Sequence, residues 1–283
     1  MDTIGEQKIW SWLDGSSKIE TASCSKVRNG RGFLVHDYLE LATRIAEIHY
    51  RNKDYMFLYR GQNKDHKNRI GNSSFQPNIF RQDENSAYKL SIHDRYKLLN
   101  IAQINVEKTL RNLKIPGFIN YSRHILPRWA ILQHYEICDT PLLDVTQSLR
   151  VAASFASIKA DDEAFVYMLG VPNLSGAITA SADAGLQIIR LSSVCPPQAV
   201  RPHIQEGYLL SEYPEITGGS QKEQYENYEV DFGRRLVAKF RFDPRSFWKP
   251  NSFQQIPELD LYPDANDPFV SIANSIKLSL KEA

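Results

Sequence analysis

Three stretches of the chain place apolar residues at the spacing of a helix. In residues 36–52 the apolar positions recur every three to four residues, and Asp37 lies near the start, which predicts an amphipathic helix. Residues 86–113 continue a similar pattern for one long helix or two consecutive helices. Residues 123–136 are expected to be helical from Pro127, because proline is favoured in a first helical turn.

Short apolar runs predict strands between and after these helices. The aromatic and apolar run 55–61 ends at Gly61, so it is expected to be a buried strand that carries Arg60 at its end. Polar residues 61–85 are expected to form a loop. Further strands are expected at 141–146, 164–171, 186–193, 199–210 and 235–242, and the C-terminal stretch 268–283 is expected to be helical.

The mixture of helices and strands shows no sign of modular organisation. No low-complexity run, proline-rich linker or fixed-period repeat interrupts the chain, so residues 1–283 are expected to form a single domain. Residues 222–235 are charged and aromatic without clear periodicity, which favours a solvated loop or a short helix. A chain of this length and apolar content can bury a core without disulfides.

The composition bears on which partners the protein binds and on where in the cell it is expected. Lys and Arg (34) nearly balance Asp and Glu (33), and the formal charge of +1 gives no polyelectrolyte signature of nucleic-acid binding. Cys24, Cys138 and Cys195 are odd in number and widely spaced, which is typical of reduced thiols in a cytosol. The first 18 residues lack an apolar leader, and no apolar run is long enough for a membrane span. The expectation is a soluble, cytoplasmic protein.

Arg60 is the first candidate for a functional side chain. An arginine at the end of an apolar strand must be partly desolvated, which is costly unless a carboxylate or an anionic ligand satisfies the guanidinium. A structural ion pair and a phosphate contact both fit this position. Gly61 favours the ligand slightly, because a glycine lets a ligand approach the backbone.

A polar cluster follows the strand at 141–146. Asp144 and Thr146 are two residues apart, so on a strand they share a face. Ser148 is placed to cap a helix through residues 149–157. The carboxylate, the hydroxyls and the helix start would suit ribose or phosphate groups, and a purely structural helix entry fits the same residues equally well.

Other sites of chemistry have weaker support. His134 ends a predicted helix, and no second histidine lies at a metal-ligand spacing, so no metal site is expected. Cys138 adjoins Asp139 and no positive charge, which argues against a reactive thiolate. The glycine-rich nucleotide loops, the nucleophile elbow and the zinc-protease motif are all missing from the sequence.

Four blocks in order resemble the FRG domain, a family named for its Phe/Tyr-Arg-Gly motif. They are "FLYRGQ" (57–62), "PNIFR" (77–81), "LQHYEICDTPLLDVTQSLRVAASFA" (132–156) and "RPHIQEGYLL" (201–210). The resemblance covers a core of about residues 35–210 and leaves 211–283 as a C-terminal strand and helix extension. The FRG domain in turn resembles the ADP-ribosyltransferase fold. That likeness implies an α+β fold with a split, mostly antiparallel sheet, an N-terminal helical layer and NAD as the substrate.

The resemblance also implies roles for individual residues. Arg60 would orient NAD, and Asp144 and Thr146 would line the nicotinamide pocket. Gln205 falls where such transferases often carry a glutamate, which stabilises the positive charge that develops as nicotinamide leaves. Glutamine supplies no negative charge, and on a strand the adjacent Glu206 would face the opposite side unless a bulge intervenes. The implied catalytic residues are Arg60, Thr146, Gln205 and Glu206, and the implied NAD-binding residues are Tyr59, Arg60, Gly61, Gln62, His134, Asp144 and Ser148.

Two hypotheses about function follow from this resemblance. The first is an NAD-dependent ADP-ribosyltransferase or NAD glycohydrolase that passes ADP-ribose to a protein, a nucleic acid or water, in bacterial stress or phage defence or as a toxin. The second is a non-catalytic module that binds a nucleotide or a partner protein. A carboxylate in one cleft with Arg60 would favour the enzyme. The sequence leaves the oligomeric state open.

Overall fold

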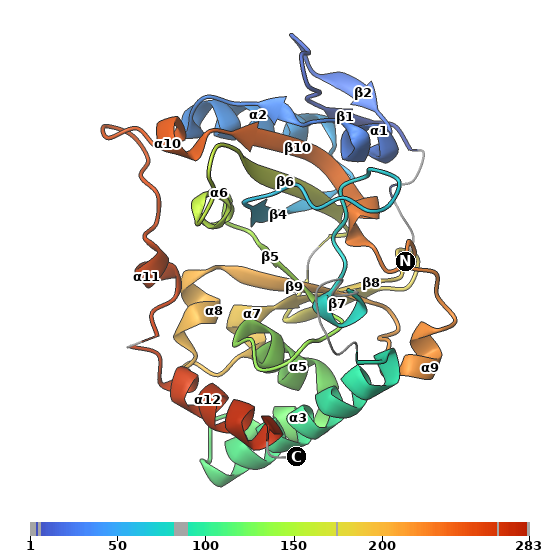
Figure 1. The fold of residues 1–283 in the computed structure, drawn as a ribbon, viewed down its shortest axis with the longest axis vertical. Helices are drawn as coiled ribbons and strands as arrows, with labels where there is room; N and C mark the ends of the chain where they lie inside the picture. Colours follow the sequence, from blue (N-terminus) through green and yellow to red (C-terminus); the bar gives the residue numbers. More distant parts are fainter. Residues whose placement is uncertain (1–3, 5–6, 82–89, 174, 265, 282–283) are drawn as a thin grey trace.

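A computed structural model describes residues 4, 7–81, 90–173, 175–264 and 266–281. Within these ranges, eight strands form one large sheet, in the order β3-β10-β6-β4-β5-β9-β8-β7 (Figure 1). β10 and β3 are parallel, and the other neighbours are antiparallel. The strands are β3 (Phe33–Leu34), β4 (Met56–Gln62), β5 (Leu143–Thr146), β6 (Ala164–Val171), β7 (Ile178–Ser181), β8 (Leu186–Arg190), β9 (Gly207–Glu212) and β10 (Leu236–Phe242).

The sheet is weakly joined at its centre. β4 pairs with β6 along its whole length, from Met56 to Gln62, and β5 pairs with β9 from Leu143 to Thr146. Between β4 and β5 the register contains a single pair, Tyr59 opposite Thr146. The two four-stranded halves therefore diverge on either side of this pair, and side chains at the ends of β4 and β5 border the gap.

Helices cover the two halves differently. α1 (Cys24–Asn29) and α2 (Tyr38–Arg51) pack their apolar residues into the core of the half that contains β10, near the small hairpin of β1 (Ile9–Ser11) and β2 (Glu20–Ala22). α3 (Ile92–Asn112), α4 (Phe118–Arg123), α5 (Ile125–His134) and α12 (Pro268–Lys281) form a second core with β8 and β9 (Figure 1).

α6 (Leu149–Ser157) follows the polar cluster and crosses β4. The Ser148 hydroxyl accepts a hydrogen bond from the Val151 amide, so this residue is the helix cap that the sequence predicted. The remaining short helices are α7 (Leu191–Val194), α8 (Val200–Ile204), α9 (Gly219–Lys222), α10 (Pro244–Phe247), α11 (Glu258–Leu261), and the 3-10 turns η1 (Asn78–Phe80) and η2 (Phe232–Arg235).

The mixed α+β class, the mostly antiparallel sheet and the larger helices agree with the sequence, while residues 82–89, where the predicted loop and the predicted helix 86–113 meet, lie outside the described residues. Two strand assignments are wrong in part. The stretch 199–210 forms α8 and then β9, and Pro202 lies inside the short helix, where its missing amide hydrogen is tolerated. The stretch 186–193 leaves the sheet at Arg190 and continues as α7. Alternating apolar residues alone did not reveal these changes of direction, because a short apolar run fits either state.

The C-terminal part of the chain contributes to the main sheet and to both halves of the molecule. β10 lies between β3 and β6, and residues beyond it run along one side of the sheet to α12 (Figure 1). Of the two alternatives for the stretch 222–235, a solvated loop or a short helix, its end forms the short helix η2, and Asp231 before it is buried.

Candidate functional site

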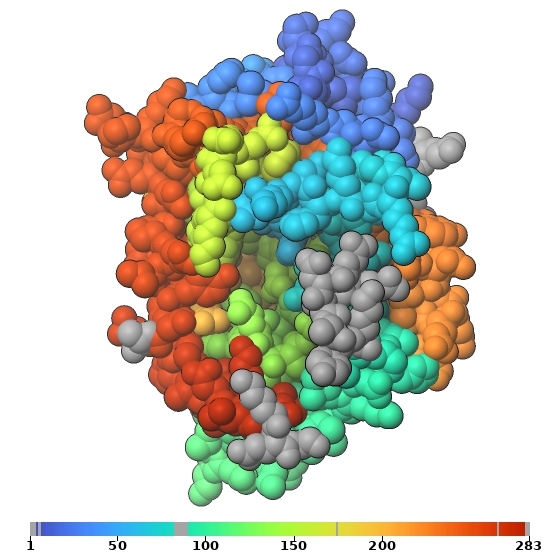
Figure 2. Space-filling model, viewed as in Figure 1, coloured from blue at the N-terminus to red at the C-terminus, as the bar shows by residue number. Residues whose placement is uncertain are grey.

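A cleft of about 1730 Å³ opens where β4 and β5 separate. Residues from the end of β4, the loop after it, the end of α5, β5, α6, α8 and the segment around α11 line it. Figure 2 shows a hollow in the middle of this face, below the cyan residues that follow β4 and beside the green residues of α5. A cavity of this size exceeds the range of about 300–1000 Å³ that holds most drug-sized ligands, so a dinucleotide would fit.

Arg60 reaches this cleft from β4, on the opposite face of the strand from Tyr59. Its Nη1 donates a hydrogen bond to the backbone carbonyl of Asp144 at 2.6 Å, and its buried Nε has no hydrogen-bond partner among the described residues. Burial lowers the pKa of Arg60 to about 10, the carboxylate of Asp144 opposes this shift, and the charge of Arg81 adds to it. Arg60 forms no ion pair with a described carboxylate, so its charge is only partly compensated.

Asp144 lies beside Arg60, and two side chains at the end of α5 contact its carboxylate. Its Oδ2 accepts a hydrogen bond from Gln133 Nε2 at 2.5 Å, and its Oδ1 lies 3.8 Å from His134 Nδ1. Burial raises the pKa of Asp144, but His134, Gln133 and Arg60 outweigh burial, and the pKa is lower than normal. The side chain is 43% exposed, so this carboxylate remains ionised and open to a ligand in the cleft.

The predicted helix and strand blocks around His134 and Asp144 form one unit, as the sequence suggested. The amide of Gln133 joins them, since its Oε1 accepts from Thr140 and its Nε2 donates to Asp144. His134 is buried against the cleft, and its Nε2 has no partner within the described chain. Two side chains of α5 therefore orient the carboxylate of Asp144.

Arg60, Thr146 and Gln205 line the same cleft, although they are far apart in sequence. The Thr146 hydroxyl donates to the backbone carbonyl of Gln205 at 2.8 Å and is buried, so its role in the structure is to join β5 to the end of α8. Gln205 is not on a strand: it caps α8, and its Nε2 donates to the Leu261 carbonyl at 2.7 Å. Both polar groups are occupied by backbone partners.

Glu206 is turned away from the cleft. It lies in the turn between α8 and β9 with φ of 45°, it is exposed, and it is not among the lining residues. The expectation that Gln205 and Glu206 follow one another on a strand is wrong, because the chain reverses there before β9 begins. Asp144 is consequently the carboxylate beside Arg60.

Three other residues that were predicted to bind NAD make contacts within the protein instead. The Tyr59 hydroxyl is 2.8 Å from His49 Nε2 of α2, so the ring of Tyr59 belongs to the core behind β4. A Cβ at Gly61 would lie 1.8 Å from the carbonyl oxygen of Ala152, so α6, rather than a ligand, makes the close approach that requires glycine. Ser148 caps α6 and is not a lining residue. Gln62 lines the cleft, as Tyr59 and Gly61 also do, and the buried Oε1 of Gln62 has no partner among the described atoms.

Several lining residues were not identified from the sequence. His66 comes from the polar loop after β4, and Arg81 ends the "PNIFR" block that carried the resemblance. Tyr262 belongs to the segment around α11, and Arg201 lies between the rings of Tyr262 and Tyr135, at 5.1 and 5.3 Å. A block that matches a family motif was a usable signal for Arg81. Nothing local marked His66 or Tyr262.

The chemistry of the cleft does not include a reactive thiol. Cys138 is a lining residue, but burial and the neighbouring Asp139 raise its pKa to about 12, so it remains protonated at neutral pH. Among the described residues, no group of three or more histidine, cysteine and acidic side chains is arranged to hold a metal ion. The helices in the described ranges include none that is long and apolar enough to cross a membrane.

Comparison with known proteins gives one match. No curated protein and no solved structure matches the chain. The model of the FRG domain matches residues 55–164, a segment that begins just before β4 and ends at the start of β6. This segment, which carries both Arg60 and Asp144, thus matches the FRG domain family, as its sequence motifs predicted.

Proposed function

We propose that the cleft binds NAD or a closely related dinucleotide, with Arg60 contacting an anionic group of the ligand. The observation that carries this proposal is a half-buried guanidinium that pairs with none of the described carboxylates, beside an ionised and accessible Asp144. The division of the sheet at a single residue pair supports the likeness to the split sheet of ADP-ribosyltransferases. The size of the cleft is consistent with a dinucleotide.

Asp144 gives the site a means of cleaving the bond between nicotinamide and ribose. As that C–N bond breaks, its electron pair leaves with neutral nicotinamide and positive charge develops on the ribose. An ionised carboxylate next to the ribose would stabilise this charge. Water, or a nucleophile on a protein or nucleic acid, would then attack the ribose carbon and lose a proton. The proposed activity is that of an NAD glycohydrolase or ADP-ribosyltransferase.

A second candidate function is a non-catalytic nucleotide-binding module. This candidate is favoured because no carboxylate from Gln205 or Glu206, where transferases often carry a glutamate, enters the cleft. Gln205 donates to Leu261, and Glu206 is outside the cleft. In this case the Arg60 and Asp144 pair would recognise the ligand without cleaving it.

Incubation with labelled NAD tests both candidates. Wild type, Arg60→Ala and Asp144→Asn are compared for nicotinamide release and for transfer of label to macromolecules, with calorimetric titration of NAD in parallel. Turnover that is lost in both variants supports the enzyme. Binding by wild type and by Asp144→Asn without turnover supports the module. No NAD binding by folded wild type would contradict both.

A further inference from the structure

Apolar side chains gather where α6 and the segment around α11 border the cleft. Phe155 and Ile158 of α6 and Leu259 and Tyr262 of the other segment all line it. Leu259 is 82% exposed, and the two aromatic rings are only half-buried. In the described part of the chain, none of the four packs into either hydrophobic core. Exposed apolar side chains that gather in a cleft are typical of a binding site.

Two contacts bring these segments to the same place. The amide of Ile256 donates to Ser154 Oγ of α6 at 2.9 Å. The rings of Phe155 and Tyr262 are nearly perpendicular, with centroids 5.7 Å apart. Figure 2 shows the yellow residues of α6 and the orange residues that follow β10 side by side at the edge of the hollow. The two rings therefore form a corner in the wall of the cleft.

α6 brings this corner to the end of β4, where Arg60 enters the cleft. A Cβ on Gly61 would lie 1.8 Å from the Ala152 carbonyl oxygen and 2.8 Å from the Ala156 amide nitrogen, so α6 crosses β4 in close contact. Phe155 belongs to this same turn of α6 and lines the cleft. Its ring therefore lies beside the end of the strand that carries Arg60.

Gln205 holds the other side of the corner against the end of β5. Its backbone carbonyl accepts from Thr146 Oγ1 at 2.8 Å, and its Nε2 donates to the Leu261 carbonyl at 2.7 Å. Arg201 adds a second attachment, since its Nη2 lies 2.5 Å from Asp264 Oδ1. These contacts flank the second ring of the corner in the sequence, so they fix this part of the wall before a ligand arrives.

We infer that the corner of Phe155 and Tyr262 binds a planar ring of the dinucleotide, and that Gln205 is a positioning residue that holds this corner in place. This inference deepens the proposed function and rests on it for the nature of the ligand. Nicotinamide and adenine both present flat faces that stack on aromatic side chains. Tyr262 and Gln205 both lie outside residues 55–164, the segment that matches the FRG domain.

NADH and ADP-ribose are the probes for the ring subsite. NADH carries both rings and is not cleaved by the proposed reaction, because its dihydronicotinamide would leave as an anion rather than as a neutral molecule. ADP-ribose carries adenine as its one heterocycle. Calorimetric titrations compare wild type with Tyr262→Phe, which keeps an aromatic ring, and with Tyr262→Leu, which keeps only apolar bulk. Thermal melts of the same samples check that both variants are folded.

Tyr262→Phe is expected to bind both probes within about twofold of wild type, whereas Tyr262→Leu should weaken NADH binding by about tenfold. Equal weakening of ADP-ribose binding assigns the corner to adenine, and ADP-ribose binding within about twofold of wild type assigns it to the nicotinamide ring. Equal NADH affinities of the two variants would overturn the inference, while NADH binding by wild type would still support the proposed function. No binding of either probe by folded wild type would contradict the proposed function itself.

Gln205→Glu tests the positioning role, with Gln224→Glu as the matched control, because Gln224 is exposed and does not line the cleft. An ionised glutamate cannot donate to the Leu261 carbonyl, so NADH binding should weaken by about fivefold or more, and NAD cleavage should not increase. The control should change neither by more than about twofold. If Gln205 acts through Tyr262, the double variant should bind NADH no more weakly than Tyr262→Leu alone. Additive losses, or faster NAD cleavage by Gln205→Glu, would overturn the positioning role.

Discussion

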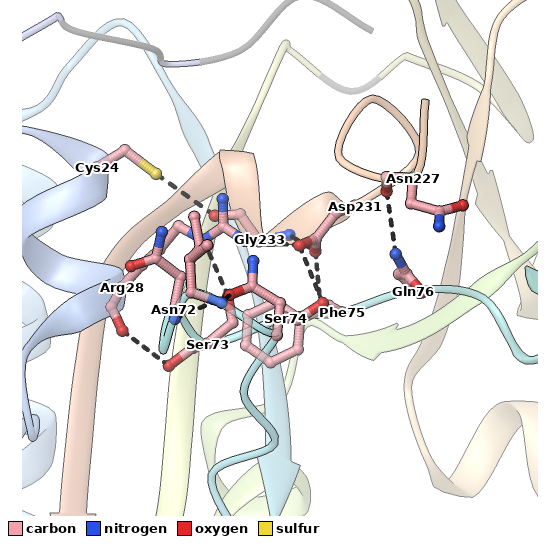
Figure 3. Close-up of polar contacts among 12 residues, drawn as sticks. Cys24, Arg28, Asn72, Ser73, Ser74, Phe75, Gln76, Asn227, Asp231 and Gly233 are labelled. Atoms are coloured by element: carbon pink, nitrogen blue, oxygen red, sulfur yellow. Dashed lines mark hydrogen bonds and ion pairs between the residues drawn. The ribbon is translucent and has the colours of Figure 1, made fainter. Parts of the chain in front are cut away.

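Two sets of buried polar groups, one at the loop after β4 and one in the cleft, differ in how fully their hydrogen bonds are satisfied. In the first, Arg28 pairs with Asp231 at 2.5 Å, and Asp231 also accepts from Ser74 and from two backbone amides (Figure 3). In the second, the cleft, Arg60 Nε, Gln62 Oε1 and His134 Nε2 have no partners among the described residues.

The difference separates arginines that hold the fold together from arginines that are available to a ligand. Arg28 is buried and Arg60 is partly buried, so residue type alone does not distinguish the two roles. The partner distinguishes them: Arg28 pairs with the carboxylate of Asp231, whereas among the described residues Arg60 donates to a backbone carbonyl and pairs with no carboxylate. Unsatisfied buried groups are costly, so the ones that line the cleft point to a ligand that satisfies them.

The largest loss of stability is expected for Asp231, whose hydrogen bonds are all made within the protein. Asp231→Ala leaves the Arg28 guanidinium and two buried backbone amides without their acceptor. The free energy of unfolding should fall by about 3–5 kcal/mol. Urea denaturation measures it, with the exposed Asp54→Ala as a control that should not change. A loss no larger than that of the control would show that this ion pair does not hold the loop.

Gly61→Ala should have the next largest effect. A Cβ there would meet the Ala152 carbonyl oxygen at 1.8 Å, so α6 must move away from β4. We expect a loss of about 3 kcal/mol in stability, together with weaker nucleotide binding, since Arg60 is the adjacent residue. Gly218→Ala is the matched control, because a Cβ at Gly218 meets no atom within 4 Å. Similar melting temperatures for the two variants would contradict the close approach of α6.

Arg60→Ala tests most directly whether a residue of the cleft binds the ligand or stabilises the fold. It removes a hydrogen bond to one carbonyl, so stability should fall by only about 1 kcal/mol. NAD binding should weaken by tenfold or more, about 1.4 kcal/mol. Arg60→Lys should restore little, because lysine keeps the charge but loses the two-pronged geometry of the guanidinium. Thermal melts and calorimetry are run on the same samples. A large loss of melting temperature with unchanged NAD binding would show that Arg60, like Arg28, stabilises the fold and does not bind the ligand.

The smallest effect concerns Asp144 and pH. Asp144→Ala leaves Gln133 Nε2 unpaired, and we expect a cost of about 1 kcal/mol, because the carboxylate is 43% exposed. The folded-state pKa of Asp144 is lowered, so its contribution is present above its unfolded pKa and is lost as the pH falls through the folded value. Denaturation at neutral and at acid pH should show the difference between wild type and Asp144→Asn shrinking in acid. A difference that grows in acid would contradict the lowered pKa.

Local patterns predicted much of the fold because each depends on residues near one another in the chain. The helix from Tyr38, the capped helix after Ser148 and the strand from Ala164 to Val171 occur where the sequence placed them. The segment from residue 199 failed, because the same apolar run is compatible with a helix or a strand until its packing is known.

The sequence by itself identified Arg60 and Asp144 as candidates, since a charged residue at the end of an apolar run must be explained by a partner or a ligand. Only the tertiary structure decided which groups face one another. The Tyr59 hydroxyl contacts His49 of α2, and Gly61 lies against the backbone of α6. The tertiary structure also turned Glu206 outward and placed His66 and Arg81 on the lining of the cleft that Arg60 enters. Side-chain direction depends on strand pairing and helix packing between distant segments, and one local stretch of sequence does not contain that information.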